Sequence, residues 1–303
     1  MDSSIKVLWP IVYRNEYNIQ FFGLENLHPF DSKKWGHIFE ILKKTIGLNE
    51  SNIYIPNEIT EEELLEIHTK RYLSSLKWSY TAARISEIPV VAILPNFLVQ
   101  RQYLKPIRFQ VGGTRLAGKV ARKEGVAINL GGGFHHCSKD QGGGFCPYAD
   151  ITFVINDALK ENSYDLVMVI DLDAHQGNGY EKDFIERAIS RAVKLDNFVQ
   201  DYEYLSSLES VLTESLLKVK PNFIVYNAGT DVLKGDQLGL LSISPQGIIE
   251  RDEMVFKVAR DNNIPLVMLT SGGYQKTTAN IIAASLQNLV KLELIKPVQV
   301  VQS

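Results

Sequence analysis

Four short apolar runs organise the second half of the chain, and glycines or polar residues follow each of them. The runs occupy residues 126–130, 166–170, 223–226 and 266–269. They are too short and too rich in β-branched residues for helices, so each predicts a buried strand. Helical stretches between most of them, such as 245–262, supply the crossovers of a parallel sheet. The pattern predicts an α/β fold.

The first half is predicted to be mainly helical. Residues 9–22 have a β-rich pattern, and helices are expected at 33–48, after a capping box at 60–63, and at 110–124. Residues 71–80 and 92–104 also look helical, although prolines and aromatic residues lie nearby. Because no repeat, low-complexity tract or linker interrupts the chain, we expect residues 1–303 to form a single domain.

The loops after the four predicted strands carry the residues that are suited to chemistry. These loops are GGGFHH at 131–136, DLDAH at 171–175, NAGTD at 227–231 and TSGGY at 270–274. In an open parallel sheet, sites form beyond the carboxyl ends of the strands, where these loops would meet. Each loop alone could be a simple turn, but four such coincidences favour a common site.

Two carboxylates and a histidine in these loops suggest a metal site. If the backbone stays extended after residue 170, Asp173 and His175 share one face, and Asp231 comes from the next loop. Such a set leaves a coordination position open for water or substrate. It suits zinc and also iron(II). The alternative is that the aspartates form turns and His175 caps a helix.

The remaining polar residues are suited to proton transfer. His135 and His136 follow three glycines, which let the backbone approach a ligand closely, and histidine titrates near neutral pH. Tyr274 could donate a proton to a developing oxyanion, or could be a packed aromatic residue. The glycine run lacks the spacing of a dinucleotide-binding fingerprint.

Composition sets limits on the protein's class and location. The chain has a net charge of -3 and 45% hydrophobic residues, so bulk charge does not indicate nucleic-acid binding. No segment has the pattern of a signal peptide or a transmembrane helix. Cys137 and Cys146 are too few for a disulfide framework and are expected to be reduced thiols. We therefore expect a nuclear or cytoplasmic protein that is not secreted; the oligomeric state stays open.

Several segments together resemble histone deacetylases, and specifically the class IV, or histone deacetylase 11, type. The matching segments are LHPFDSKKWG, LPNFLVQR, INLGGGFHHCSKDQGGGFCPYADI, DLDAHQGNG, YNAGTDVLKGDQLGLLSISP and TSGGYQ. The resemblance implies an arginase/deacetylase-like fold, with a central parallel sheet of about eight strands flanked by helices. It also implies hydrolysis of N-ε-acyl-lysine in proteins, with histones among the substrates and long-chain fatty acyl groups preferred over acetyl.

The resemblance assigns a role to each candidate residue. Asp173, His175 and Asp231 would bind one Zn²⁺, His136 would be the general base and acid, and His135 would assist electrostatically. The other assignments are Asp171 orienting His135, Tyr274 polarising the acyl carbonyl, and Gly144, Phe145 and Gly272 lining the acyl-lysine tunnel. Asn178 stands where an aspartate often lies behind the second histidine, so His136 should be less readily protonated.

The chain departs from the family after Gly179. About twenty residues appear to be absent there, roughly one strand with its flanking turns, and only 192–195 is a weak strand candidate before residue 223. In relatives this stretch forms one tunnel wall and supplies ligands for a potassium ion, which is therefore doubtful here. Three alternatives remain: a catalytically impaired splice form, a non-catalytic binding protein, and, less favoured because a further bridging aspartate is absent, a two-metal ureohydrolase.

Overall fold

A six-stranded parallel sheet forms the centre of the computed structural model, which describes residues 5–27, 31–161, 163–184, 189–190 and 200–301. Its strand order is β2-β3-β7-β6-β4-β5. The strands are β2 (Ile11–Val12), β3 (Val126–Asn129), β4 (Val167–Asp171), β5 (Ile189–Ser190), β6 (Phe223–Asn227) and β7 (Leu266–Leu269). The remaining two strands of the described residues, β1 (Ile5–Leu8) and β8 (Val298–Val301), pair antiparallel outside this sheet. The central sheet is thus smaller than the expected eight strands, because these two terminal strands pair with each other instead.

The four strands predicted from the apolar runs are present at the expected positions. Every residue of β4, β6 and β7 is buried. Continuous apolar strands of this kind are typical of a parallel sheet that is covered on both faces. Since β3, β7, β6 and β4 are neighbours in the sheet, the loops at their carboxyl ends lie at the same edge.

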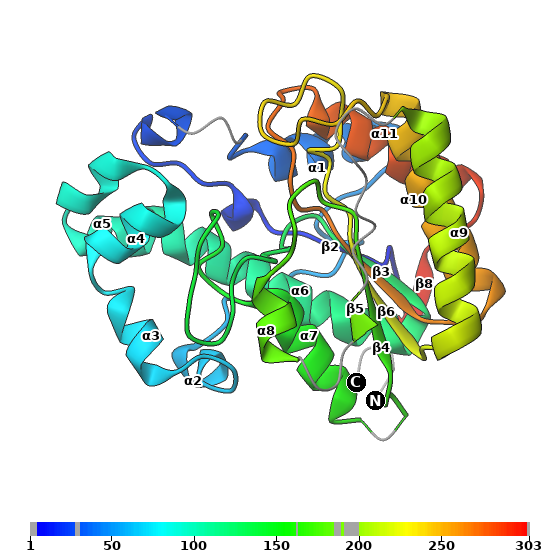
Figure 1. The fold of residues 1–303 in the computed structure, drawn as a ribbon, viewed down its shortest axis with the longest axis horizontal. Coiled ribbons are helices and arrows are strands. Elements are labelled where there is room, and N and C mark those ends of the chain that lie inside the picture. The colour runs from blue at the N-terminus through cyan, green and yellow to red at the C-terminus, as the bar shows by residue number, and fades with distance from the viewer. Residues whose placement is uncertain (1–4, 28–30, 162, 185–188, 191–199, 302–303) are drawn as a thin grey trace.

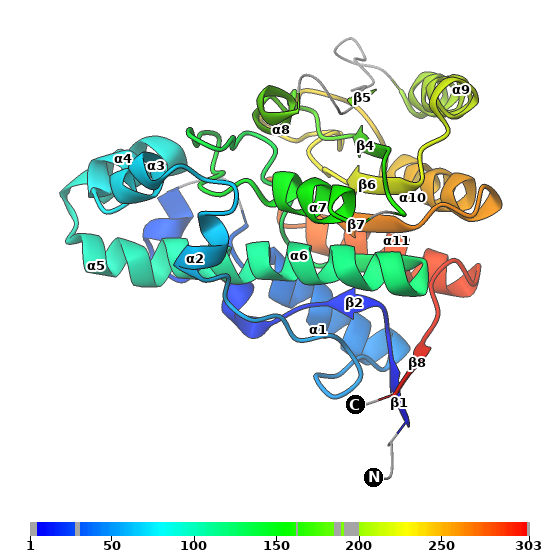
Figure 2. The same ribbon diagram turned by 90° about the horizontal axis from the view of Figure 1, so that it is seen from below.

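Helices cover the two faces of the sheet. In Figures 1 and 2, α6 and α7 lie on one side of the strands, and α9 and α10 lie on the other. The helices of the sheet layers are α1 (Lys34–Ile46), α6 (Lys105–Glu124), α7 (Asp150–Leu159), α8 (Gly179–Asp183), α9 (Asp201–Val219), α10 (Pro245–Asp261) and α11 (Thr278–Lys291). Four shorter helices extend the molecule at one end: α2 (Glu61–Leu64), α3 (Lys70–Ser75), α4 (Ser79–Ser86) and α5 (Asn96–Val99). No helix among the described residues has the length and apolar character needed to span a bilayer.

The first half is mainly helical as predicted, with three differences. The β-rich expectation for residues 9–22 is wrong beyond Ile11–Val12, because a 3-10 turn at Asn15–Tyr17 follows the strand. The capping box at Thr60 is confirmed: the Thr60 side chain accepts from the backbone N–H of Glu63, and the Glu63 side chain accepts from the backbone N–H of Thr60. The helix α2 that follows has only four residues. The helix expected from residue 110 begins at Lys105, directly after a π-helical turn at Gln100–Leu104 that continues from α5, and Pro106 lies at this junction.

The segment after Gly179 contains a strand that the sequence did not predict. The two residues of β5 pair in parallel with Met168 and Val169 of β4. Two residues are too few to produce a recognisable alternation of polar and apolar positions, so no sequence pattern reveals them. The weak candidate at 192–195 lies outside the described residues.

Candidate functional site

The loop after β3 is fixed by a buried carboxylate. Gly133 has a φ of 80°, and a Cβ there would lie 2.3 Å from Oδ1 of Asn227, so only glycine fits. The carboxylate of Asp150, the first residue of α7, accepts the backbone N–H groups of Gly133 at 2.7 Å and Phe134 at 2.8 Å. These bonds determine the path of the chain immediately before His135.

His135 lies in a buried polar network at the edge of the sheet. Its Nδ1 is 3.0 Å from Oδ2 of Asp171, the last residue of β4. Asp171 also accepts from Nδ2 of Asn227 at 2.9 Å and from the hydroxyl of Tyr180 at 3.1 Å. Burial opposes protonation of His135, but the carboxylates of Asp171 and Asp173 outweigh it and raise the pKa of His135 to about 9.

His136 has a different electrostatic environment from its neighbour. Its Nδ1 is 3.4 Å from the amide Oδ1 of Asn178, which carries no charge. Burial and the nearby His135 lower the pKa of His136 to about 4. The tandem histidines therefore differ: the environment favours the protonated form of His135 and the neutral form of His136.

Asp173, His175 and Asp231 meet as predicted, although by a different local geometry. The chain turns after Asp171 instead of remaining extended, and the backbone N–H of His175 donates to Oδ1 of Asp173 at 3.0 Å. Nδ1 of His175 lies 3.2 Å from Oδ1 of Asp173 and 2.8 Å from Oδ2 of Asp231. One ligand atom from each of the three residues lies within 4.8 Å of the other two. The expected extended backbone is therefore wrong, whereas the expected convergence is correct.

Two buried carboxylates at this point create an unfavourable concentration of negative charge. Burial and the adjacent Asp173 carboxylate raise the pKa of Asp231 to about 7. Hydrogen bonds to the same two carboxylates raise the pKa of His175 to about 10. A cation would favour the ionised form of both aspartates, and two carboxylate oxygens with an imidazole nitrogen form a common donor set for a divalent metal.

A small cavity of about 50 Å³ adjoins the histidines. Seven of the predicted site residues line it: His135, His136, Gly144, Phe145, Asp173, Gly272 and Tyr274. Among the other lining residues, Trp35 and Phe134 are large and aromatic. Phe145 adopts a φ of 63°, and its backbone N–H donates to the carbonyl of Ile85 at 2.8 Å, which fixes this part of the wall.

Tyr274 lines the same cavity and lies near His175. Its backbone N–H donates to Oδ2 of Asp236 at 2.9 Å, and its ring centroid is 6.3 Å from that of His175. Burial and the carboxylate of Asp173 raise the pKa of the Tyr274 phenol, which therefore remains a proton donor. At Gly272, a Cβ would lie 2.5 Å from Oδ2 of Asp173, so the chain can pass this close to the carboxylates only with glycine.

Sequence reasoning missed two buried basic side chains that contact the loops carrying Asp231 and Tyr274. Lys34, at the start of α1, is fully buried and donates to the carbonyls of Ser271 and Gly272. Arg251 of α10 is also fully buried and donates to the carbonyl of Gly229, two residues before Asp231. Neither position follows a predicted strand, and a lysine or arginine on a helix is usually exposed, so no local pattern reveals them. The bracing roles of Asp150 and Asn227 were also missed, because their hydrogen-bond partners come from other segments of the chain.

Comparisons with known proteins identify the family. The histone deacetylase domain family matches residues 28–190 and 185–290. Histone deacetylase 2 of Arabidopsis thaliana is 47% identical and covers 94% of this chain and 80% of its own length. Probable histone deacetylase 19 of Zea mays is 26% identical over 82% of this chain, which spans about half of that relative (54%).

A solved structure shares the fold. The crystal structure of the HDA15 HD domain superimposes with a TM-score of 0.72 over 94% of this chain and 88% of the other, at 18% identity. The expected fold class, a parallel sheet flanked by helices, is therefore confirmed. Together with the family match over most of its length, these findings show that the chain belongs to the histone deacetylase family.

Proposed function

We propose that this protein is a zinc-dependent lysine deacylase of the class IV type, hydrolysing N-ε-acyl-lysine side chains of proteins. The observation that carries the proposal is the convergence of Asp173, His175 and Asp231 beside the His135–His136 pair. A ligand set alone would suit a structural metal, whereas the adjacent histidines supply the proton transfer that amide hydrolysis needs. The names of the relatives support histones as substrates and nuclear action.

The residues present fit a single divalent metal ion. Asp173, His175 and Asp231 would hold it, and its charge would relieve the repulsion between the two buried carboxylates. When bound, zinc would activate water and polarise the acyl carbonyl. The chain has Asn178 after the ligand histidine, with no further aspartate in DLDAHQGNG to bridge a second ion, which favours one metal over the two of a ureohydrolase.

The chain's own residues would divide the proton transfers between them. Neutral His136 accepts a proton from the attacking water, because its low pKa keeps the imidazole unprotonated near neutral pH. His135, held by Asp171, supplies positive charge. A cation bound at the neighbouring carboxylates would lower the pKa of His135 and so reduce this charge. The Tyr274 phenol donates a hydrogen bond to the developing oxyanion. His136, protonated in the first step, then donates this proton to the nitrogen of the lysine amine as it leaves.

The small volume beside the histidines supports a short acyl group. A cavity of about 50 Å³ holds only a few water-sized groups, since each needs roughly 10–15 Å³ of such volume. An acetyl group fits this space. A myristoyl chain is longer than this space and would extend beyond it, so we propose acetyl as the group that fits without movement of the walls.

The match to the Arabidopsis relative supports the absence of a segment. It extends over 308 positions but includes 94% of this chain, which is about 285 residues, so about 23 positions of the relative have no counterpart here. The family match also divides into two parts around residues 185–190, close to the proposed site of the absence. These gaps in the two matches favour an impaired splice form as the second candidate. Such a protein would bind partners without efficient turnover.

The first prediction concerns the metal. The purified protein should bind about one zinc per chain, and Asp231→Ala should lose most of it, because two remaining ligands hold the ion weakly. Metal content after dialysis measures this. Asp261→Ala, which removes an exposed carboxylate at the end of α10, should retain the metal. Two tightly bound manganese ions per chain would contradict the single-zinc site.

The second prediction concerns turnover. Acetyl-lysine peptides should be hydrolysed at least as efficiently as myristoyl-lysine peptides, and His136→Ala and Tyr274→Phe should each lower kcat on the order of a hundredfold while zinc is retained. Liquid chromatography of the peptides measures both effects. A variant that keeps the parent rate would remove that residue from the mechanism, and a preference for myristoyl would restore the long-chain expectation.

The third prediction concerns pH. Asn178→Asp places a negative charge beside Nδ1 of His136, which favours the protonated imidazole and raises its pKa. Because His136 works as a base only when neutral, the acid limb of the kcat/KM profile should move upward by about one pH unit or more. Gln176→Glu, which adds a charge to an exposed neighbour in the same loop, should shift it much less. Identical profiles for Asn178→Asp and the parent would contradict this role of His136.

The fourth prediction concerns the absent segment. Inserting the corresponding residues of the Arabidopsis relative after β5 should raise both the deacylation rate and the Tm, because an added strand would pair with β5, the last strand of the sheet among the described residues. Thermal unfolding and peptide hydrolysis of the two proteins measure this. An insertion of equal length made of glycine and serine is the matched control. Equal activity and Tm for the natural insertion and the parent would show that the segment is dispensable.

A further inference from the structure

The end of the molecule formed by α4 and α5 exposes four large apolar side chains. Trp78 and Tyr80, at the start of α4, are 72% and 73% exposed, and Ile93 and Phe97 are 83% and 68% exposed. Figures 1 and 2 both place α4 and α5 at the end opposite α9 and α10. We call these four residues the apolar end. Bulky apolar groups clustered at one surface are typical of a contact site.

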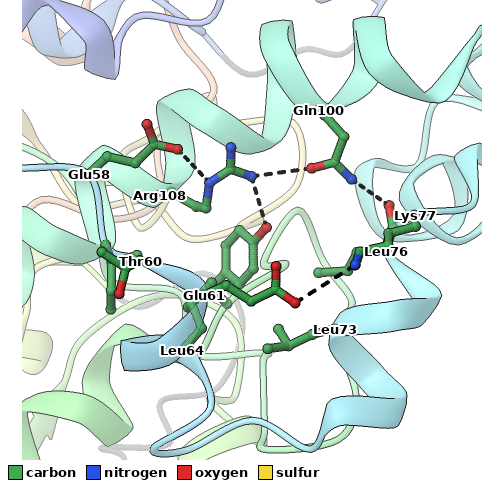
Figure 3. A pocket seen from close by; sticks show the side chains of 11 residues that line it. Glu58, Thr60, Glu61, Leu64, Leu73, Leu76, Lys77, Gln100 and Arg108 are labelled. Atoms are coloured by element: carbon green, nitrogen blue, oxygen red, sulfur yellow. Dashed lines mark hydrogen bonds and ion pairs between the residues drawn. The ribbon is translucent and has the colours of Figure 1, made fainter.

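Hydrogen bonds hold the segments of the apolar end together. Oγ of Ser79 donates to the carbonyl of Leu94 at 2.7 Å, which joins the start of α4 to the segment that carries Ile93. Gln100 donates to the carbonyl of Leu76 at 2.9 Å and accepts from Arg108, as Figure 3 shows. The four apolar side chains therefore project from a fixed backbone.

The same part of the chain is strongly basic. Residues 70–105 contain six lysines and arginines and one glutamate, whereas the whole chain has a net charge of -3. The basic residues are Lys70, Arg71, Lys77, Arg84, Arg101 and Lys105. Arg71, Arg84 and Arg101 are exposed, and none forms an ion pair with another residue in the described ranges. These cations are therefore available to an external anion.

We propose that the apolar end and its basic surroundings bind the surface of an anionic lipid bilayer. Tryptophan and tyrosine are favoured at the boundary between lipid headgroups and acyl chains, where Ile93 and Phe97 would insert. Arg84 and Arg101 would contact the anionic headgroups. This proposal does not depend on lysine deacylation.

The high exposure of the four apolar side chains favours a lipid bilayer over an acidic protein as the binding partner. Side chains that are at least two thirds exposed project outward, and a fluid lipid surface adapts to them, whereas a protein partner needs matching hollows. A cavity of about 400 Å³ lies beside the apolar end, between α2, α3 and α6 (Figure 3). Its lining contains Glu58 and Glu61 as well as Lys77 and Arg108, so this balanced cavity does not select an anion.

Vesicle binding of the full chain tests the proposal. The protein should cosediment with phosphatidylcholine vesicles that contain about one third phosphatidylserine, and much less with pure phosphatidylcholine or at high salt. Trp78→Ala combined with Phe97→Ala, and separately Arg84→Glu combined with Arg101→Glu, should each weaken binding on the order of tenfold. The tryptophan emission of the parent should shift to shorter wavelength on binding, and Trp78→Ala should abolish the shift, because Trp35 is buried and Trp9 is partly buried against the core.

Matched variants at the opposite end serve as controls. Tyr202→Ala combined with Leu217→Ala on α9 removes equally exposed apolar groups, at 83% and 75% exposure, and should leave vesicle binding unchanged. Circular dichroism should show the same Tm for all variants, because the changed side chains are exposed. Absence of binding to anionic vesicles at low salt overturns the proposal. So does equal weakening by the α9 variant, or binding to polyglutamate without binding to vesicles.

Discussion

The burial of two carboxylates side by side is the constraint on which the site depends. Asp173 and Asp231 lie at the ends of neighbouring strands, with His175 between them, and the environment cannot easily keep both ionised. Folding brings them together because a parallel sheet directs all its carboxyl ends to one edge. The resulting negative charge raises the pKa of His135 and, under the proposed function, would favour a bound cation.

Buried polar groups from distant helices hold the ligand loops in place. Asp150 of α7 binds the glycine loop before His135, Lys34 of α1 binds the loop before Tyr274, and Arg251 of α10 binds the loop before Asp231. Loops that expose backbone groups in the interior need such partners, because an unpaired buried carbonyl or N–H group is costly. The helical layers thus fix the orientation of the site in addition to covering the sheet.

The neighbouring histidines show how environment separates two identical side chains. A carboxylate faces His135, whereas an amide faces His136, and the resulting pKa values lie on opposite sides of neutrality. One imidazole is thereby suited to carry positive charge and the other to accept a proton. Under the proposed mechanism, the identity of residue 178 would therefore influence the chemistry, although its side chain is exposed.

The sequence by itself determined the four principal strands, the loops after them and the residues that meet there, because apolar runs and the polar residues after them are local signals. It also determined the capping box at Thr60 and most of α10. Only the tertiary structure decided that β1 and β8 pair outside the central sheet, that β5 joins its edge and that the chain turns after Asp171. The same holds for the buried positions of Lys34 and Arg251, because their carbonyl partners come from segments far away in the chain, and such long-range contacts leave no local pattern.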